Sequence, residues 1–143
     1  MLIGRYIDGR PMIEGFVDIP SLGLRGFILF LIDTGSDGTV LMPKDAAQLK
    51  INYKKLTKRH AVLSAGGPIL NHICSVKASF AVLGQTEYEY DVMVGLPKHS
   101  SALMAAPSIL GLDILNRWQI SLNPETRTVI GMPQSWDRQR PLR

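Results

Sequence analysis

The chain has 143 residues, of which 45% are hydrophobic and 20% charged, a composition typical of one ordinary folded domain. Its single cysteine, Cys74, excludes an intrachain disulfide and a cysteine-based zinc cluster. The formal net charge of +4 is modest, and the three histidines are spread singly, so the sequence indicates neither a nucleic-acid partner nor a metal site.

The two ends of the chain are polar and differ from the middle. We expect a single domain over residues 1–143, with its core at about 12–131 and terminal arms at 1–11 and 132–143. No stretch has the apolar length of a signal peptide or a membrane span, so we expect a cytoplasmic protein without a membrane partner. The basic residues are expected in a solvated loop and a loose tail: Lys50, Lys54, Lys55, Lys58, Arg59, Arg138, Arg140 and Arg143.

The first half of the chain predicts strands that lead to one helix. Met12–Ile19 and Arg25–Ile32 flank the turn signal Pro20–Gly23 and predict a hairpin. Val40–Met42 continues as a short strand. A helix is expected over Pro43–Lys50, because proline is favoured at the first helical position and good helix formers follow it.

The second half predicts further hairpins and a second short helix. A turn over Ala65–Pro68 separates two strands, and the three histidines are expected at the surface or in loops. Trp118 is expected to pack in the core. The remaining expected elements are strands at 69–76, 77–83, 86–94, 108–110, 118–122 and 127–130, and a helix at 112–117.

One stretch, Phe27–Pro43, carries the chemistry. Its apolar run ends at a carboxylate, Asp33, which is followed by a turn of Thr34, Gly35 and Ser36. Residues of these types form tight turns, because glycine reaches positive φ and the others bond their own backbone. A chain places an ionisable group at the end of a buried strand mostly where the carboxylate has a chemical task.

Asp33-Thr34-Gly35-Ser36 resembles the active-site signature of aspartic proteases, and the longer run to Leu41 resembles their single-domain, retropepsin-like branch. Ile109-Leu110-Gly111, followed by Leu112–Leu115, resembles the hydrophobic-hydrophobic-glycine motif and short helix near the end of that domain. A Gly-Gly segment lies between the two motifs. The resemblance spans roughly Ile13–Ile130 and implies a mostly β fold: a closed retropepsin-like β-barrel, half of a pepsin-type enzyme, with two short helices.

A single Asp-Thr-Gly implies two chains. Hydrolysis of an amide in this way needs one ionised carboxylate to activate water and one protonated carboxyl to donate a proton. The chain has one such turn and about half the length of a two-lobed enzyme. The second Asp33 must therefore come from an identical chain across a two-fold axis, which makes the protein itself the expected partner.

The resemblance assigns further roles residue by residue. Asp33 would be the catalytic acid and base, Thr34 would hydrogen-bond across the dimer, and Gly35 would leave room for the substrate backbone. Gly111 would pack beneath the Asp33 loop. No cofactor or metal is implied. The expected contacts of a peptide or protein substrate, with a preference for bulky apolar residues at the cut, are Ser36 and Asp37 beside the carboxylate, the tip of a flap at Ser64, Ala65, Gly66 and Gly67, and the pocket walls Pro107 and Ile109.

The sequence departs from the retroviral pattern at two points. Leu112 stands where retroviral enzymes have an arginine that pairs with the acid at the place of Asp37, and the segment before the flap is longer. Both departures favour a cellular or bacterial relative. The sequence leaves open whether N-terminal or C-terminal strands form the dimer sheet. It also leaves two alternatives to a peptidase: a catalytically inactive dimerisation or peptide-binding module, and the self-releasing protease segment of a polyprotein.

Overall fold

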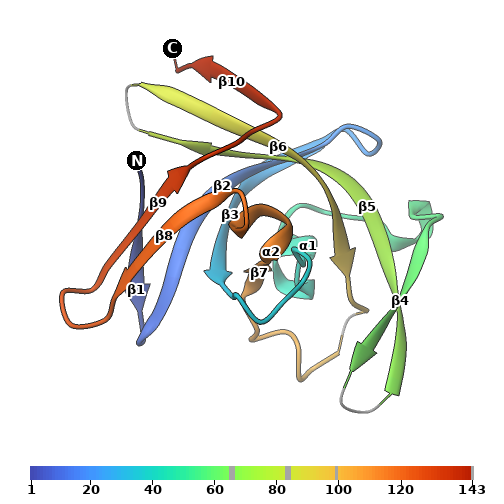
Figure 1. The fold of residues 1–143 in the computed structure, drawn as a ribbon. Coiled ribbons are helices and arrows are strands. Elements are labelled where there is room, and N and C mark those ends of the chain that lie inside the picture. The colour runs from blue at the N-terminus through green and yellow to red at the C-terminus, as the bar shows by residue number, and fades with distance from the viewer. Residues whose placement is uncertain (65–66, 83–84, 99, 143) are drawn as a thin grey trace.

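A computed structural model describes residues 1–64, 67–82, 85–98 and 100–142, with side chains described outside residues 60–70. The fold is mostly β with two short α-helices, as the sequence predicts (Figure 1). The described strands are β1 (Leu2–Ile7), β2 (Arg10–Ile19), β3 (Leu24–Ile32), β4 (Arg59–Ser64), β5 (Gly67–Ala81), β6 (Thr86–Leu96), β7 (Ser108–Leu110), β8 (Trp118–Asn123), β9 (Thr128–Pro133) and β10 (Arg138–Pro141). The helices are α1 (Pro43–Gln48), α2 (Leu112–Leu115) and the 3-10 turn η1 (Tyr53–Lys55).

Strand β2 is the centre of the sheet, because three strands pair with it. Along one edge, β2 pairs antiparallel with β3 over nearly its whole length. The pairs run from Met12 with Leu31 to Ile19 with Leu24, which confirms the predicted hairpin. The other edge is shared between β1 at the start of β2 and β5 at its end. The sheet runs in the order β10-β6-β5-β2-β1-β9-β8, while β7 joins β3 in parallel and β4 joins β5.

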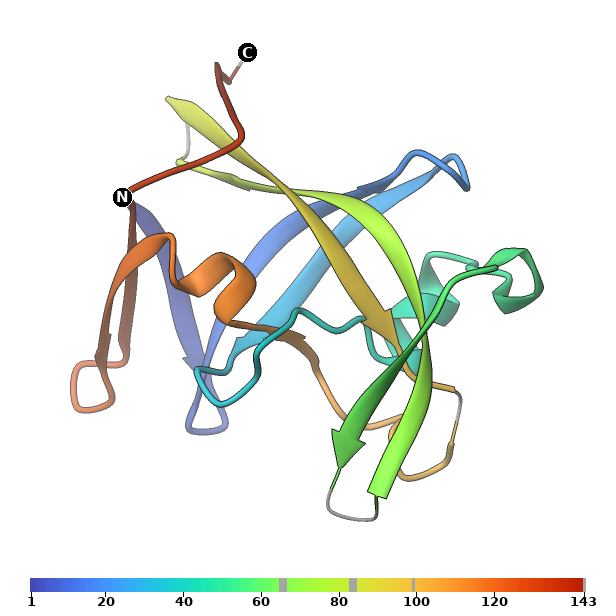
Figure 2. The ribbon, with the colours of Figure 1, turned by 45° about the vertical axis from the view of Figure 1, so that its right-hand side comes forward.

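The sheet stays open, which corrects the expectation of a closed barrel. Its path ends at β10 on one side and at β8 on the other, and no pairing between described residues joins these ends. In Figures 1 and 2, β4 and the adjoining part of β5 extend away from the other strands. No helix among the described residues is long and apolar enough to cross a membrane.

An aromatic cluster fills the core. The rings of Phe80 and Trp118 meet edge to face with their centroids 4.9 Å apart, and Trp118 is 6% exposed, which confirms its predicted burial. The indole N–H of Trp118 donates a hydrogen bond to the Tyr90 hydroxyl at 2.8 Å, and that hydroxyl donates to the carbonyl of Ser135 at 2.9 Å. Each polar atom of the cluster is thereby satisfied, which makes its burial inexpensive.

The N-terminal segment, expected as a terminal arm over residues 1–11, is a strand of the sheet. Strand β1 lies between β2 and β9 and pairs antiparallel with both. Leu2 is 1% exposed, since it faces the core beside Val129 and Gly131. The sequence signal is weak here because the exposed and buried side chains of this short strand do not alternate cleanly in hydrophobicity.

The C-terminal tail is not loose either, because charge holds β10 to the edge of β6. Arg138 forms ion pairs with Glu89 and Asp91, and Arg140 pairs with Glu87 and Glu89. Every residue of β10 is exposed, so apolar burial contributes little to its position. The sequence suggests that these arginines are solvated, because their acidic partners lie on the neighbouring strand β6 and are far away along the chain.

Three smaller differences concern strand boundaries and burial. Strand β5 is one continuous strand, where the sequence predicted two. Val40 makes only isolated bridges, to Gly95 and Ile109, rather than a strand. His72 is 5% exposed, although a surface or loop position was expected. The helix after the Asp33 turn begins at Pro43 as predicted.

Candidate active site

Asp33 lies at the C-terminal end of β3, on a loop that reaches Thr39. The carboxylate is partly exposed, and the backbone N–H of Gly35 donates to its Oδ1 at 2.9 Å. A Cβ at position 35 would lie 3.2 Å from the same oxygen, so any side chain there would crowd the carboxylate. The turn therefore holds Asp33 in a fixed orientation while leaving one face open.

The backbone around Gly111 fixes this loop from below. The N–H of Asp33 donates to Leu110 O at 3.1 Å, and the N–H of Leu112 donates to Ser36 O at 2.8 Å. A Cβ at Gly111 would lie 2.3 Å from the carbonyl oxygen of Gly38, so only glycine fits this approach. The loop and the start of α2 lie side by side in Figures 1 and 2.

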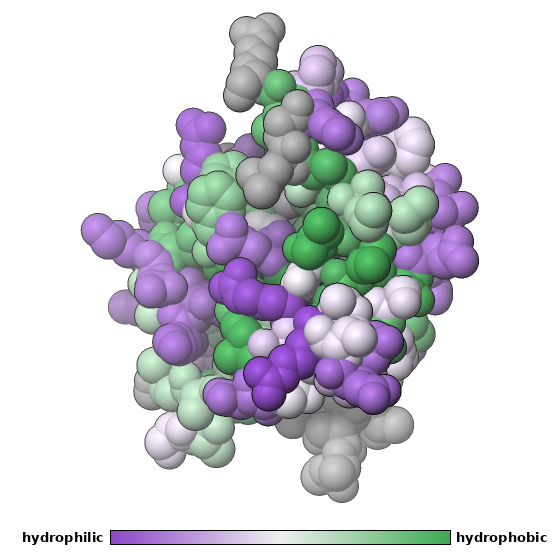
Figure 3. Space-filling view, turned by 90° about the vertical axis from the view of Figure 1, so that its left-hand side faces the viewer, coloured by the Kyte–Doolittle hydropathy of each residue, from purple (hydrophilic) through white to green (hydrophobic). Residues whose placement is uncertain are grey.

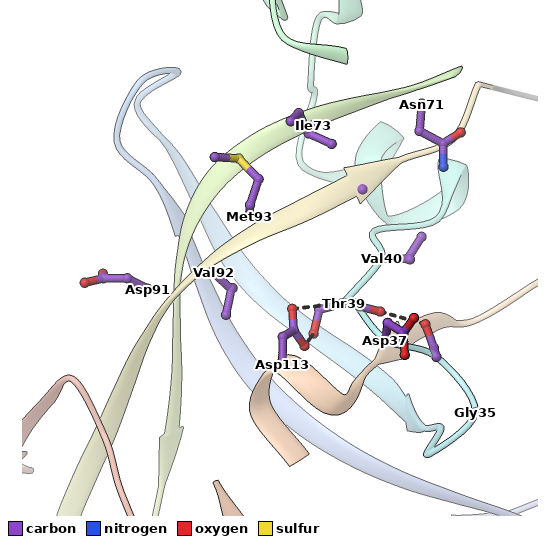
Figure 4. A pocket seen from close by; sticks show the side chains of 13 residues that line it. Gly35, Asp37, Thr39, Val40, Asn71, Ile73, Asp91, Val92, Met93 and Asp113 are labelled. Carbon is purple, nitrogen blue, oxygen red and sulfur yellow. Dashed lines mark hydrogen bonds between the residues drawn. The ribbon is translucent and has the colours of Figure 1, made fainter. Parts of the chain in front are cut away.

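A partly buried carboxylate ties the far end of the loop to α2. Asp113 accepts hydrogen bonds from the Thr39 hydroxyl at 2.7 Å and from the Thr39 N–H at 3.0 Å (Figure 4). The Thr39 hydroxyl in turn accepts from the N–H of Gly111 at 3.2 Å, and Thr39 is 1% exposed. Because each bond closes a contact between distant parts of the chain, this cluster locks the loop onto the second motif.

Neighbouring loop residues either bond within the loop or face solvent. The hydroxyl of Ser36, a predicted substrate contact, donates to Gly38 O at 2.7 Å and so braces the loop. Asp37 is exposed, and no ion pair or side-chain hydrogen bond joins it to the described residues. Thr34 is exposed as well.

A cavity of about 850 Å³ opens beside the loop. Its floor is the segment Gly35–Val40 with Asp113, and β5 and β6 form its opposite wall (Figure 4). The wall includes Asn71 and Ile73 from β5, and Asp91, Val92, Met93 and Gly95 from β6. The cavity mixes apolar and acidic groups, and its volume lies in the range of small-molecule and side-chain pockets.

The cavity includes some predicted site residues and omits others. Gly35, Ser36 and Asp37 line it, whereas Asp33, Pro107 and Ile109 do not. Ala65 and Gly66 of the predicted flap tip lie outside the described residues. Ser64 and Gly67 pair as backbone at the end of the β4–β5 hairpin. The wall residues of β5 and β6 were missed, because alternation assigns them to a face but only strand pairing shows what that face opposes.

His72 is buried at the root of the β4–β5 hairpin. Its ring meets Tyr53 edge to face at 5.7 Å, and its Nδ1 has no hydrogen-bond partner among the described residues. Burial lowers the pKa of His72, the charges of Arg59 and Lys98 lower it further, and a hydrogen bond to the Leu56 backbone opposes them. His72 is therefore neutral at neutral pH.

The side chains at the site favour carboxylate chemistry over thiol chemistry. Cys74 is buried, and burial raises the pKa of its thiol, so the thiolate needed for a nucleophile is disfavoured. Within the described ranges, no group of three or more histidine, cysteine or acidic side chains converges as metal ligands would. On the loop beside the cavity, the partly exposed carboxylate of Asp33 is the candidate reactive group.

The profile of the aspartyl protease family matches residues 24–114, which contain both motifs, and the chain belongs to this family. Its fold is that of retropepsin-like proteases: a crystal structure of a retropepsin-like aspartic protease from Rickettsia conorii superimposes with a TM-score of 0.63. The two are 20% identical, and the similarity covers 99% of this chain and 92% of that one. No curated protein matches the chain.

Proposed function

We propose that the protein is an aspartic endopeptidase that acts as a homodimer, with one Asp33 from each chain forming the catalytic pair. The proposal rests on how the structure positions Asp33. Its carboxylate is partly exposed and is oriented by the Gly35 N–H. The loop that carries it is hydrogen-bonded at both ends to the segment Ile109-Leu110-Gly111 and the adjoining helix. Family membership supports the same activity.

The mechanism follows from bringing two such carboxylates together. Two unit charges ~3 Å apart repel by about 5 kcal/mol at an effective dielectric of ~20, so the pair retains one proton, as in the established dyad of aspartic proteases. The ionised Asp33 takes a proton from water as the water attacks the peptide carbonyl. The protonated Asp33 donates its proton to the carbonyl oxygen, and a proton then passes to the leaving nitrogen as the C–N bond breaks.

The substrate would lie extended in the cavity between the Asp33 loop and the wall of β5 and β6. Thr34 is proposed to bond across the dimer, and Ser36 and Asp37 to contact the substrate beside the carboxylate. Ile73, Val92 and Met93 give the wall its apolar part, which supports a preference for bulky apolar side chains near the cut. The hairpin tip from Ser64 to Gly67 is proposed to close over the substrate, and Pro107 and Ile109 to contact it once the second chain completes the cleft. The cytoplasmic location stays a prediction from the sequence.

Replacement of Asp33 by asparagine tests the activity. Asp33→Asn keeps the shape of the side chain but removes the shared proton, so cleavage of an apolar-rich peptide library should fall at least about a thousandfold while the dimer persists in sedimentation. Asp18→Asn, on β2, is the matched control and should cleave like the wild type. The wild-type rate should be highest at acidic to mildly acidic pH.

Two results would contradict the proposal. One is an Asp33→Asn variant that still cleaves at the wild-type rate. The other is a wild-type rate that is flat between about pH 4 and about pH 9, because a pair that shares one proton must lose activity once both carboxylates are ionised.

A further inference from the structure

Strand β6 changes its partner along one of its edges. At one end of this edge, β10 pairs with residues 86–89, and the Leu142 N–H donates to Gln85 O at 2.9 Å. At the other end, the Gly95 N–H donates to Thr39 O at 3.0 Å. Every second residue of a strand faces the same edge, so the odd-numbered positions of β6 all face this one. Between the two contacts, this edge has no strand partner among the described residues.

Asp91 and Met93 supply the backbone groups of the open stretch. The Asp91 N–H donates to Oδ2 of Asp137 at 2.7 Å. The Asp91 carbonyl and both backbone groups of Met93 face the edge, and no backbone group of the described residues bonds to them. Outward N–H and C=O groups of this kind are what a further strand needs, so the stretch can accept one in either direction.

The open stretch lies inside the cavity beside the Asp33 loop. Asp91, Val92 and Met93 line this cavity of about 850 Å³, and the loop segment 35–40 forms its floor. Figure 4 shows the three residues following one another along β6, with the loop across the cavity from them. Met93 is 45% exposed, so the edge is accessible. A peptide that adds to β6 would therefore share the cavity with a substrate held over the loop.

The charge at this edge favours a basic strand. Strand β10 occupies the neighbouring part of the same edge, and its Arg138 pairs with Glu89 and with Oδ1 of Asp91. Oδ2 of Asp91 has no ion-pair partner among the described residues, since Lys77, opposite on β5, forms none with it. The cavity lining includes three aspartates and no lysine, arginine or histidine. A basic side chain that enters along β6 would thus meet complementary charge.

The exposed apolar groups on another side of the molecule are remote from this edge. Figure 3 views the side on which β1, β8 and β9 lie in Figure 1, and apolar side chains gather there within a polar surround. Ile3, Leu122 and Met132 are the exposed apolar residues of these strands. In the sheet order, β5, β2 and β1 separate β6 from β9. A peptide on β6 therefore leaves that surface free for other contacts.

We propose that the stretch 91–93 of β6 is a second contact for the substrate. A segment that flanks the cleaved bond adds to this edge as a strand, and a lysine or arginine of that segment binds the Asp91 carboxylate. The inference rests on the proposed function, because it names the class of substrate for the same cavity: extended polypeptides with a basic residue outside the apolar residues at the cut. Such a contact holds the flank equally before and during the reaction, so it should lower KM and leave kcat unchanged.

Two peptides of different length test the contact without changing the protein. The short peptide holds only the apolar residues around the cut, and the long peptide adds flanks that contain one lysine. The long peptide should have the lower KM. Methylation of the backbone N–H groups of the flanks, one position at a time, should raise KM about fivefold at the position that bonds to β6, because it removes one hydrogen bond.

A matched pair of variants tests the edge of β6 itself. Met93→Pro removes the outward N–H, whereas Met93→Ala removes the same side chain and keeps the N–H. The proline variant should lose about fivefold more of the advantage of the long peptide than the alanine variant. Circular dichroism checks that both variants are folded.

The role of charge is tested by exchanging the lysine of the long peptide for glutamine. We expect the wild type to favour the lysine peptide about threefold in KM, because Asp91 is half exposed. Asp91→Asn should abolish this preference. Arg138→Ala breaks the same ion pair but leaves the carboxylate, so it should widen the preference, which a merely structural role of the pair would not do.

Binding of the same peptides to the Asp33→Asn variant, measured by fluorescence anisotropy, separates the edge from the chemistry. Tighter binding of the long peptide that depends on the Met93 N–H supports the inference even if the wild type cleaves nothing, a result that would contradict the proposed function alone. Equal binding of the two peptides, or equal losses in the proline and alanine variants, would overturn the inference and leave the proposed protease intact. A proline variant that weakens the dimer in sedimentation velocity but not peptide binding would assign the edge to a second copy and overturn the inference as well.

Discussion

Two polar side chains are buried on either side of the cavity, and they are satisfied to different degrees. In the floor, the Thr39 hydroxyl donates to Asp113 and accepts from the N–H of Gly111. At the root of the hairpin opposite, the Nδ1 of His72 has no partner among the described residues. Both residues are almost completely buried, at 1% and 5% exposure.

The difference separates a rigid part of the site from a part that responds to pH. A buried polar cluster with all its bonds made resists opening, because breaking one bond leaves the others unpaired. A buried neutral imidazole with a free nitrogen has a second state, the protonated one, which its surroundings disfavour. The floor should therefore hold Asp33 at any pH that suits the chemistry, while the hairpin root should weaken in acid.

The largest expected loss of stability comes from a steric clash in the floor of the cavity. Gly111→Ala would place a methyl group 2.3 Å from Gly38 O and 2.9 Å from Ser36 O, both backbone atoms that cannot move alone. We expect a loss of about 4 kcal/mol in the free energy of unfolding, measured by urea denaturation. Gly38→Ala is the matched control on the same loop, because a Cβ there meets nothing within 4 Å. An alanine at 111 that is tolerated as well as one at 38 would mean that the floor is not rigid.

The second-largest expected loss of stability comes from removing the Asp113 carboxylate, which lies in the floor of the cavity. Asp113→Ala leaves the N–H and hydroxyl of Thr39 without their acceptor and should cost about 3 kcal/mol in thermal or urea unfolding. Asp37→Ala, on the same loop but exposed, should change stability by less than about 0.5 kcal/mol. Equal effects of the two substitutions would show that burial of the Thr39–Asp113 contact contributes nothing.

A pH titration of stability sharpens the contrast at the hairpin root. The pKa of His72 is lowered in the folded state, so below about pH 6.5 the unfolded chain binds a proton that the folded chain does not. Stability from this group is complete above that pH, and we expect it to decrease as the pH drops from about 6.5 to about 5. The His72→Phe variant should lack this component when its unfolding free energy is compared with that of the wild type across the same range. An identical pH dependence in both proteins would remove His72 as the cause.

The smallest effect comes from a region held by exposed charge. Arg140→Ala, on β10, breaks the pairs with Glu87 and Glu89 of β6, and because Arg140 is 53% exposed we expect a loss of only about 0.5 kcal/mol. The loss should shrink further in 1 M salt, where the screening length is about 3 Å. Arg25→Ala is the control, since Arg25 forms no ion pair with the described residues. A loss as large as that of Asp113→Ala would place β10 in the same rigid unit as the floor.

Local signals in the sequence predict the floor well. The turn after Asp33, the start of α1 at Pro43 and the packing motif at Gly111 each depend on residues next to one another in the chain. The Thr39–Asp113 contact could not be predicted in the same way, because its partners are 74 residues apart and each is an ordinary polar residue in its own segment.

The wall of the cavity and the terminal strands of the sheet depend on the pairing between strands, which could not be predicted from the sequence. The burial of His72 follows from η1 covering one face of β5, and nothing in its neighbours along the chain indicates this cover. The same holds for β1 and β10, whose order comes from β9 and β6. Hydrophobic alternation identifies a face of a strand, but the partner of that face is set by tertiary structure.

A mixing experiment tests most directly the claim that one Asp33 from each of two chains forms the active pair. Wild-type chains are equilibrated with a rising excess of Asp33→Asn chains, and the cleavage rate per wild-type chain is measured. Because mixed dimers carry one carboxylate, the rate should fall to about one tenth at a ninefold excess. A rate per wild-type chain that stays constant at every ratio would show that a single Asp33 suffices and would contradict the account.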